Sequence, residues 1–348
     1  MKKLSLFLFL IFLSQDAFAP SLCWSEGQIS DKVDTIIQKG IDLVHQDKYD
    51  EGITEFKKIV DSYPDEPLGY FFMAAAYQNL IDDYRNEKYR AEFEKYIELA
   101  IVKGKDKLSQ SDSSAEHFFY LGGTYGYRGI YRSVRGNWWG AYKDARKAKS
   151  LLEKALELKP DLYDAYFGLG AYHYWASVKS KLLSWLPFIG DDRKKGIYQL
   201  NMAVTKGKYT SLEAKYSLLR VYYEEKNYNM VLKLSEELKG FFEYHPFRLW
   251  NMGFAYIGLK RWDEALQTFQ TLLAYFKSSP YYNLVAEMEC RGWSGYIYYQ
   301  KGEYRKSLEM VNFVLINEEN VKESDYAQPI VEQAKDLNEK ILKKLSSK

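Results

Sequence analysis

The sequence contains few of the residues on which cross-linking and chain-breaking depend. Of its 348 residues only two are cysteine and eight are proline. A chain with so few thiols is not a disulfide-rich scaffold, and we expect Cys290 to be a buried thiol within a helix. The scarcity of proline favours long helices, because proline interrupts them.

A surplus of either charge is also missing. The chain has 49 basic and 47 acidic residues, a formal net charge of +2. Nucleic-acid binding usually requires a clustered basic face, so we expect no nucleic-acid partner. The 47% hydrophobic and 28% charged content is that of a globular protein with a large core. Aromatic residues, in contrast, are plentiful at 17%.

The motifs of common enzymes are absent. The sequence contains no HExxH, GxSxG, Walker loop or CxxC. The acidic pairs Asp82-Asp83 and Asp191-Asp192 lie where we expect helices to end or begin, so helix capping explains them without a metal. We therefore predict a protein that is not an enzyme and that has no cofactor and no metal site.

The N-terminal residues are typical of an export signal. Lys2 and Lys3 precede an apolar run, Leu4–Leu13, that is too short to span a bilayer. Ala17-Phe18-Ala19 has the small-x-small pattern of a peptidase site. We predict a signal peptide and short leader over residues 1–25.

The leader sequence is compatible with more than one cleavage site. Cleavage after Ala19, Cys23 or Ser25 fits the residues, and a lipid anchor on Cys23 is the alternative to a freely exported chain. We expect the protein to be exported, either periplasmic or associated with the outer membrane of a Gram-negative-type bacterium.

The stretch Leu249–Phe269 contains the clearest example of a pattern that recurs along the chain. In LWNMGFAYIGLKRWDEALQTF, Gly253 is followed by Tyr256, then by Ala265 nine residues later and Phe269 four after that. The small residues allow two helices to approach closely, and the rings fill the space between them. This pattern resembles the tetratricopeptide repeat, a pair of antiparallel helices with a period of about 34 residues.

The same pattern can be followed along the chain. The small position of the first helix falls at residues 40, 74, 122, 170, 219, 253 and 295. The resemblance to the tetratricopeptide-repeat superfamily implies an all-α fold, a right-handed α-solenoid of about seven helical hairpins. We predict a single solenoid domain over residues 26–348, in which each pair buries the apolar face of its neighbour. An amphipathic stretch at 325–346 is expected to be the capping helix. His173 occupies a tyrosine position of the pattern, so we expect it in the core.

The spacing is not uniform. Successive small positions are 34, 48, 48, 49, 34 and 42 residues apart. We interpret the excess as extended hairpins at 114–158 and 162–206, each taller than its neighbours. Asn137 is expected to cap the returning helix of the first, and Asp191 or Asp192 that of the second.

The extended hairpins carry a candidate surface of arginines and aromatic rings. One interpretation is a site for an anionic or sugar-like ligand, with contact to a membrane surface through the apolar residues 185–189. The other is that the two hairpins pack on one another and leave the arginines solvated. The extended-hairpin residues are Arg128, Arg132, Arg135, Trp138, Trp139, Trp185 and Phe188.

A second candidate surface follows from the resemblance, which implies that the first helix of each pair lines a concave face. The positions that flank the small residue and the tyrosine are mostly aromatic, as in peptide-binding grooves, where rigid rings supply contact area. The alternative is that a tightly wound superhelix buries these rings. The predicted groove residues are Phe119, Phe167, Tyr174, Trp175, Tyr216, Arg220, Tyr223, Trp250, Phe254, Tyr296 and Tyr299.

Three functions follow. The first is a non-catalytic scaffold of the cell envelope that binds a protein or peptide in the aromatic groove. The second is a periplasmic protein that binds a glycan or small molecule through the extended hairpins. The third is a structural lipoprotein at the outer membrane. A repeat fold alone does not choose among them.

Overall fold

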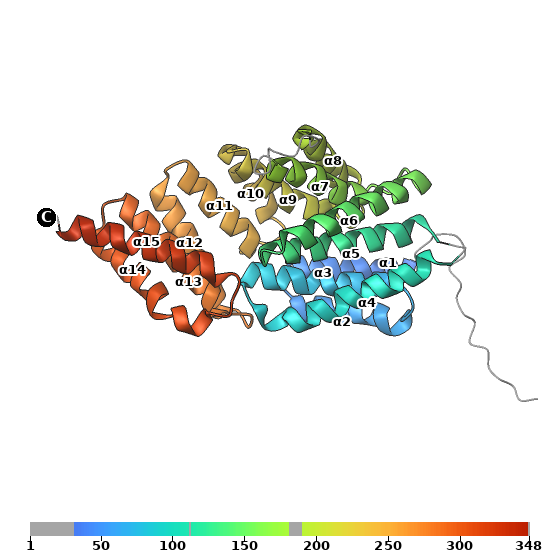
Figure 1. The fold of residues 1–348 in the computed structure, drawn as a ribbon, viewed down its shortest axis with the longest axis horizontal. Helices are drawn as coiled ribbons and strands as arrows, with labels where there is room; N and C mark the ends of the chain where they lie inside the picture. Colours follow the sequence, from blue (N-terminus) through green and yellow to red (C-terminus); the bar gives the residue numbers. More distant parts are fainter. Residues whose placement is uncertain (1–30, 111–112, 181–189, 347–348) are drawn as a thin grey trace, which may run out of the picture.

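The computed structural model describes residues 31–110, 113–180 and 190–346. Over these ranges the secondary structure consists of fifteen α-helices and short 3-10 turns, without a β-strand. The predicted all-α solenoid is confirmed. Figure 1 shows the hairpins stacked in chain order, with α15 reaching one end of the molecule.

Consecutive helices form seven hairpins, called repeats one to seven here, and a final helix. The pairs are α1 (Asp31–His45) with α2 (Tyr49–Ser62), α3 (Pro67–Tyr84) with α4 (Arg90–Leu108), α5 (Ala115–Val134) with α6 (Trp138–Leu158), α7 (Ala165–Ser180) with α8 (Arg193–Lys206), α9 (Ser211–Glu224) with α10 (Tyr228–Lys239), α11 (Pro246–Gly258) with α12 (Trp262–Ser278) and α13 (Leu284–Gln300) with α14 (Tyr304–Ile316), followed by α15 (Ala327–Ser346).

Small residues set how closely the two helices of a repeat approach. A Cβ atom on Gly253 would lie 2.7 Å from the ring of Phe269, so the predicted glycine and phenylalanine are in contact. In repeat four a Cβ atom on Gly170 would lie 2.8 Å from the carbonyl oxygen of Gly196. Because that neighbour is backbone, α7 and α8 cross at a distance that only glycine permits.

The turns within the hairpins share a feature of backbone conformation. Where the turn between the two helices of a repeat is described, one of its residues has a left-handed backbone conformation. Such a residue ends a helix by satisfying its last carbonyl groups. These residues are Asp47, Arg85, Gly136, Lys226, Lys260 and Gly302.

The third repeat has long helices, 20 residues in α5 and 21 in α6. Asn137 caps α6 as predicted, since its side chain accepts a hydrogen bond from the Gly140 amide at 3.0 Å. In the fourth repeat α7 and α8 have 16 and 14 residues. Much of the extra length of this repeat lies between the two helices, where residues 181–189 are outside the described part. Asp192 occupies the N-cap position of α8 without a capping hydrogen bond, whereas Asp191 Oδ1 accepts a hydrogen bond from the Arg193 amide at 3.2 Å.

The core joins repeats that are far apart in the chain. The ring of Tyr84, at the end of α3, lies 5.2 Å from that of Phe276 in α12 and 5.4 Å from that of Tyr281. The Tyr281 hydroxyl accepts a hydrogen bond from the Asp50 amide at 3.1 Å. An open solenoid buries each repeat only against its neighbours. Here repeats one and two also pack against repeats six and seven, so the array closes on itself.

Candidate interaction surfaces

The predicted groove residues fall into two groups. Four side chains are buried: Phe119, Tyr174, Tyr216 and Trp250. Six are partly buried, and Arg220 is exposed. The partly buried residues are Phe167, Trp175, Tyr223, Phe254, Tyr296 and Tyr299.

Closure of the array explains why Trp250 is buried, with 2% of its surface exposed. The guanidinium of Arg85, from repeat two, lies over the indole at 5.2 Å from the ring centroid. The same guanidinium forms an ion pair with Glu289 of α13 at 2.7 Å. Although burial favours the neutral form, the charge of Glu289 raises the pKa of Arg85. The groove that was expected at Trp250 is therefore occupied by the protein itself.

Tyr216 is buried in the same way. Its ring is stacked on His45 of α1 at 5.4 Å and lies 4.3 Å from His245, which precedes α11. Burial lowers the pKa of both histidines. His173, in contrast, lies in the core of repeat four as predicted, where its Nδ1 is 2.7 Å from the side-chain oxygen of Gln199.

Several of the predicted groove residues on repeats five to seven remain accessible. The ring of Phe254 in α11 lies 5.9 Å from Tyr223 in α9 and 5.1 Å from Trp293 in α13. Trp293 in turn lies 6.0 Å from Tyr296. All four rings are partly exposed. We call this continuous row, Tyr223, Phe254, Trp293 and Tyr296, the aromatic ladder.

Trp293 is absent from the predicted groove residues. It stands two positions before the small residue Gly295, whereas the predicted residue stands three positions before the small one elsewhere, as Trp250 does before Gly253. Arg85 and Tyr326 were also missed, because they come from a helix end and a loop that the repeat pattern does not assign to the groove. Glu289 lies within α13, at a position that the prediction did not use.

Arg220 lies one turn before Tyr223 on α9. Among the described residues its guanidinium has no hydrogen bond and no ion pair, although it is exposed. Burial by surrounding protein, and then the charge of Arg85, lower its pKa. Arg220 therefore combines access to solvent with a reduced preference for its charged form. Because a neighbouring cation disfavours the charged form of Arg220, an anionic group beside it would be stabilising.

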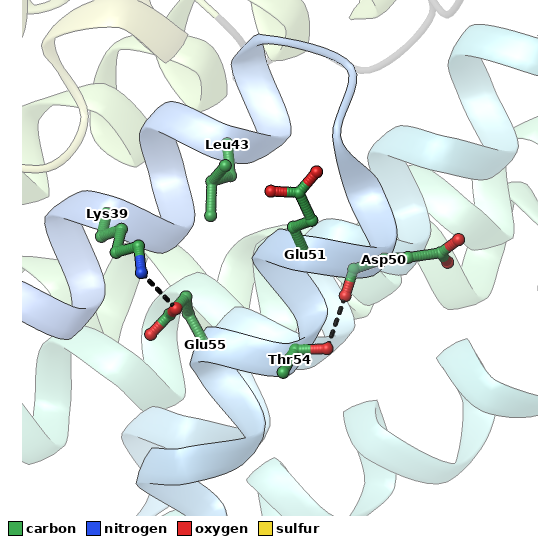
Figure 2. A pocket seen from close by; sticks show the side chains of 6 residues that line it. All are labelled: Lys39, Leu43, Asp50, Glu51, Thr54 and Glu55. Carbon is green, nitrogen blue, oxygen red and sulfur yellow. Dashed lines mark hydrogen bonds and ion pairs between the residues drawn. The ribbon is translucent and has the colours of Figure 1, made fainter.

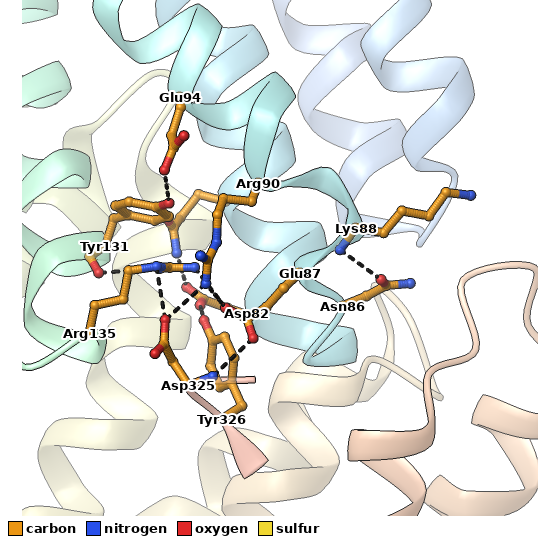
Figure 3. A network of polar contacts seen from close by, with 11 residues as sticks. Asp82, Asn86, Glu87, Lys88, Arg90, Glu94, Tyr131, Arg135, Asp325 and Tyr326 are labelled. Carbon is orange, nitrogen blue, oxygen red and sulfur yellow. Dashed lines mark hydrogen bonds and ion pairs between the residues drawn. The ribbon is translucent and has the colours of Figure 1, made fainter. Parts of the chain in front are cut away.

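Figure 3 shows a polar network that fastens the last loop to repeats two and three. Asp325 accepts hydrogen bonds or ion pairs from Arg90 at 2.9 Å and Arg135 at 3.2 Å, and its amide donates to Glu87 at 3.0 Å. The hydroxyl of Tyr326 donates to Asp82. Arg135, a predicted surface residue, therefore takes part in closing the array.

The other two predicted arginines are also paired. Arg128 binds Asp144 of α6 through two hydrogen bonds of 2.9 Å, and Arg132 binds the same carboxylate at 2.8 Å. All three arginines line a pocket of about 390 Å³ between α4 and α5, with Phe93 and Ile97 among its apolar lining. The carboxylates already present satisfy these cations, which leaves them little capacity for a further anion.

Trp138 and Trp139 are among the most exposed large apolar side chains of the described residues. They begin α6 and have 58% and 66% of their surfaces exposed. Trp185, Phe188 and the expected membrane contact at 185–189 lie outside the described residues. The packing of the two extended hairpins through those side chains stays a prediction.

A further hollow lies between α1 and α2 (Figure 2). It has a volume of about 310 Å³ and is lined by Leu43 and by a Lys39–Glu55 ion pair of 2.7 Å. In the part of the chain that the structure describes, no cluster of three potential metal ligands occurs. The helices described there include none long and apolar enough to cross a bilayer.

Comparison with known proteins agrees with this architecture. The tetratricopeptide-repeat family model matches residues 249–279. The TPR repeat-containing protein YpiA of Bacillus subtilis (strain 168) is 30% identical over 66 residues, which are 19% of this chain and 16% of YpiA. The match therefore spans only about a sixth of that relative.

Two solved structures share the fold. The APC/C hetero-tetramer Cut9-Hcn1 matches with a TM-score of 0.53 and 14% identity, over 90% of this chain and 57% of that one. A Rap protein complexed with Competence and Sporulation Factor matches with a TM-score of 0.51 and 15% identity, over 91% and 93%. The fold and the repeat spacing define an α-solenoid of helical hairpins. The chain is a member of the tetratricopeptide-repeat superfamily.

Proposed function

We propose that this protein is a non-catalytic scaffold that binds a peptide or protein segment along the aromatic ladder, with Arg220 contacting an anionic group of the partner. The observation that carries the proposal is the continuous, partly exposed row of rings on three successive repeats. Proteins with this fold include a Rap protein solved with Competence and Sporulation Factor, so a bound factor is compatible with the architecture.

The ladder fits a polypeptide better than a compact ligand. Its rings come from α9, α11 and α13, so the surface is elongated across the repeats. Aromatic side chains bury a large area while losing little conformational freedom, and for this reason they dominate the binding energy of many interfaces. The extended-hairpin arginines, in contrast, are already paired with carboxylates.

The partner belongs to the cell envelope if the leader directs export. Lys2, Lys3 and the apolar run Leu4–Leu13 support this location. Fractionation of cells that produce the full chain tests the location separately from binding. Recovery of an uncleaved protein in the cytosol would remove the envelope from the proposal and leave the ladder intact.

Site-specific cross-linking tests the ladder. The photoreactive p-benzoylphenylalanine replaces Trp293 in one variant and Ile316, which is 78% exposed at the end of α14, in a control. We expect a discrete cross-linked product from envelope extract at position 293 only. Adding Arg220→Glu should abolish that product, while Arg305→Glu, at another exposed arginine, should not. Identical products at both positions, or a product that Arg220→Glu leaves unchanged, would refute the proposal.

A further inference from the structure

The charge of this chain is concentrated in one place. Residues 128–150 contain seven basic side chains and one acidic side chain, a balance of +6, whereas the whole chain has +2. The rest of the chain therefore has a balance of −4. Four of the seven basic side chains, Arg128, Arg132, Arg135 and Lys149, are paired with carboxylates, which leaves Lys143, Arg146 and Lys147. This stretch comprises the end of α5 and the beginning of α6.

Exposed apolar side chains lie within the same stretch. We call them the tip patch; their exposed fractions range from 38% to 66%, whereas side chains of these types are usually covered. They come from the last two turns of α5 and the first turns of α6 and so lie near one end of the hairpin. The tip patch consists of Ile130, Val134, Trp138, Trp139 and Tyr142.

Cations lie directly over the aromatic members of the patch. Lys143 Nζ is 5.2 Å from the centroid of Trp139, Lys179 Nζ of α7 is 5.3 Å from that of Trp138, and Arg146 lies 6.0 Å from Tyr142. Among the described residues none of Lys143, Arg146 and Lys147 has an ion pair. The acidic Asp144 is buried and already binds Arg128 and Arg132. The surface thus presents rings and unpaired positive charge together.

We propose that the tip patch binds the surface of an anionic lipid bilayer. Tryptophan and tyrosine favour the boundary between headgroups and acyl chains, because an apolar ring and a polar group are each accommodated there. Basic side chains beside them are attracted to anionic headgroups. The aliphatic Ile130 and Val134 favour a bilayer over a nucleic acid, since stacked bases offer rings a partner but offer aliphatic side chains none.

Vesicle flotation tests the proposal with the predicted mature chain from residue 26, because the leader run Leu4–Leu13 is itself apolar. We expect binding to vesicles of phosphatidylcholine mixed with phosphatidylglycerol. Vesicles of phosphatidylcholine alone should bind much less, and added salt should weaken binding to the mixed vesicles.

Two variants separate the contributions of charge and rings. Lys143→Glu/Arg146→Glu/Lys147→Glu should weaken partitioning about a hundredfold or more, because each basic side chain at an anionic surface contributes about a fivefold factor. Trp138→Ala/Trp139→Ala should weaken binding to both kinds of vesicle. Both sites are exposed, so circular dichroism and the thermal midpoint should stay close to those of the unaltered protein.

The controls make the same chemical changes elsewhere. Lys233→Glu/Arg305→Glu/Lys343→Glu reverses three exposed cations that form no ion pair within the described part of the chain, and Tyr198→Ala/Phe241→Ala removes two exposed rings. These variants should bind like the unaltered protein.

Quenching by brominated lipid gives a second measurement. Tryptophan emission should be quenched in the unaltered protein and much less in Trp138→Phe/Trp139→Phe. Absence of binding to the mixed vesicles, or equal effects of the tip and control variants, would overturn the proposal. Binding of an oligonucleotide in place of vesicles would also overturn it and identify the patch as a nucleic-acid site.

Discussion

Arg85 and Glu289 form an ion pair at 2.7 Å although they are 204 positions apart in the sequence. Arg85 ends α3 in a left-handed conformation, and its guanidinium lies between the rings of Trp250 and Tyr326. The pair thus joins repeat two to repeats six and seven and to the loop before α15. Such contacts join repeats that are distant in the chain. We therefore expect loss of the Arg85–Glu289 ion pair to affect the whole fold.

Removal of one partner tests this. Arg85→Ala should destabilise the protein by about 1–3 kcal/mol, since it leaves the partly buried carboxylate of Glu289 without its ion-pair partner. Arg85→Leu/Glu289→Leu should lose less, because no charge remains unpaired. Urea unfolding followed by circular dichroism measures both. Unchanged unfolding of Arg85→Ala would show that the pair does not contribute to closure.

The crossing of α7 and α8 at Gly170 predicts a large effect from one methyl group. Gly170→Ala should cost about 1–3 kcal/mol or more, because the added atom meets the backbone of Gly196, which cannot rotate away. Gly126→Ala is the matched control, since a Cβ atom there meets nothing within 4 Å. It should stabilise α5 by up to about 1 kcal/mol. Thermal unfolding of both variants decides; equal midpoints would contradict the prediction.

The left-handed turn residues offer a way to stabilise the protein. Lys260 has φ +57° between α11 and α12, a conformation that an L-residue adopts at a cost. Lys260→Gly should therefore gain about 0.5–1 kcal/mol after the entropy of the unfolded chain is counted. Lys260→Ala should gain nothing, and Gly302→Ala, at φ +76°, should lose a similar amount. The urea midpoints of the three variants check the prediction, and a gain from Lys260→Ala would contradict it.

The features that could be predicted from the sequence are those that depend on residues close together in the chain. The contact of Gly253 with Phe269, the cap at Asn137 and the burial of Cys290 and His173 follow from spacings within one repeat. Local spacing determines which face of a helix a side chain occupies, and the fold class follows from it.

The burial of predicted groove residues such as Trp250, in contrast, depends on side chains from distant repeats. Trp250 stands at a groove-facing position, but Arg85 from repeat two covers it. The arginines at 128 and 132 share a helix face as their spacing indicates, yet the spacing does not show that Asp144 faces them from α6. Tertiary contacts between distant repeats leave no periodic signal, so the closed array could not be predicted from one sequence.

The stacked group of His45, Tyr216 and His245 predicts a dependence of stability on pH. Burial lowers the pKa of both imidazoles below the ordinary value of 6.5. The unfolded chain therefore binds protons that the folded chain excludes, and the free energy of unfolding should fall as the pH drops below about 6.5. Asp83, Glu213 and Arg248 also face this group and contribute to the electrostatic field on it.

A neighbouring carboxyl acts in the opposite sense, so the measurement has to separate the two. Burial raises the pKa of Asp47 to about 6, which makes its contribution to stability decrease as the pH rises through that value. The difference in unfolding free energy between the unaltered protein and His45→Gln/His245→Gln cancels this contribution. That difference should change by up to about 2.8 kcal/mol per pH unit for two histidines between about pH 6 and about pH 5, with the unaltered protein losing more as the pH falls. A difference that is constant across this range would show that neither imidazole titrates differently on folding.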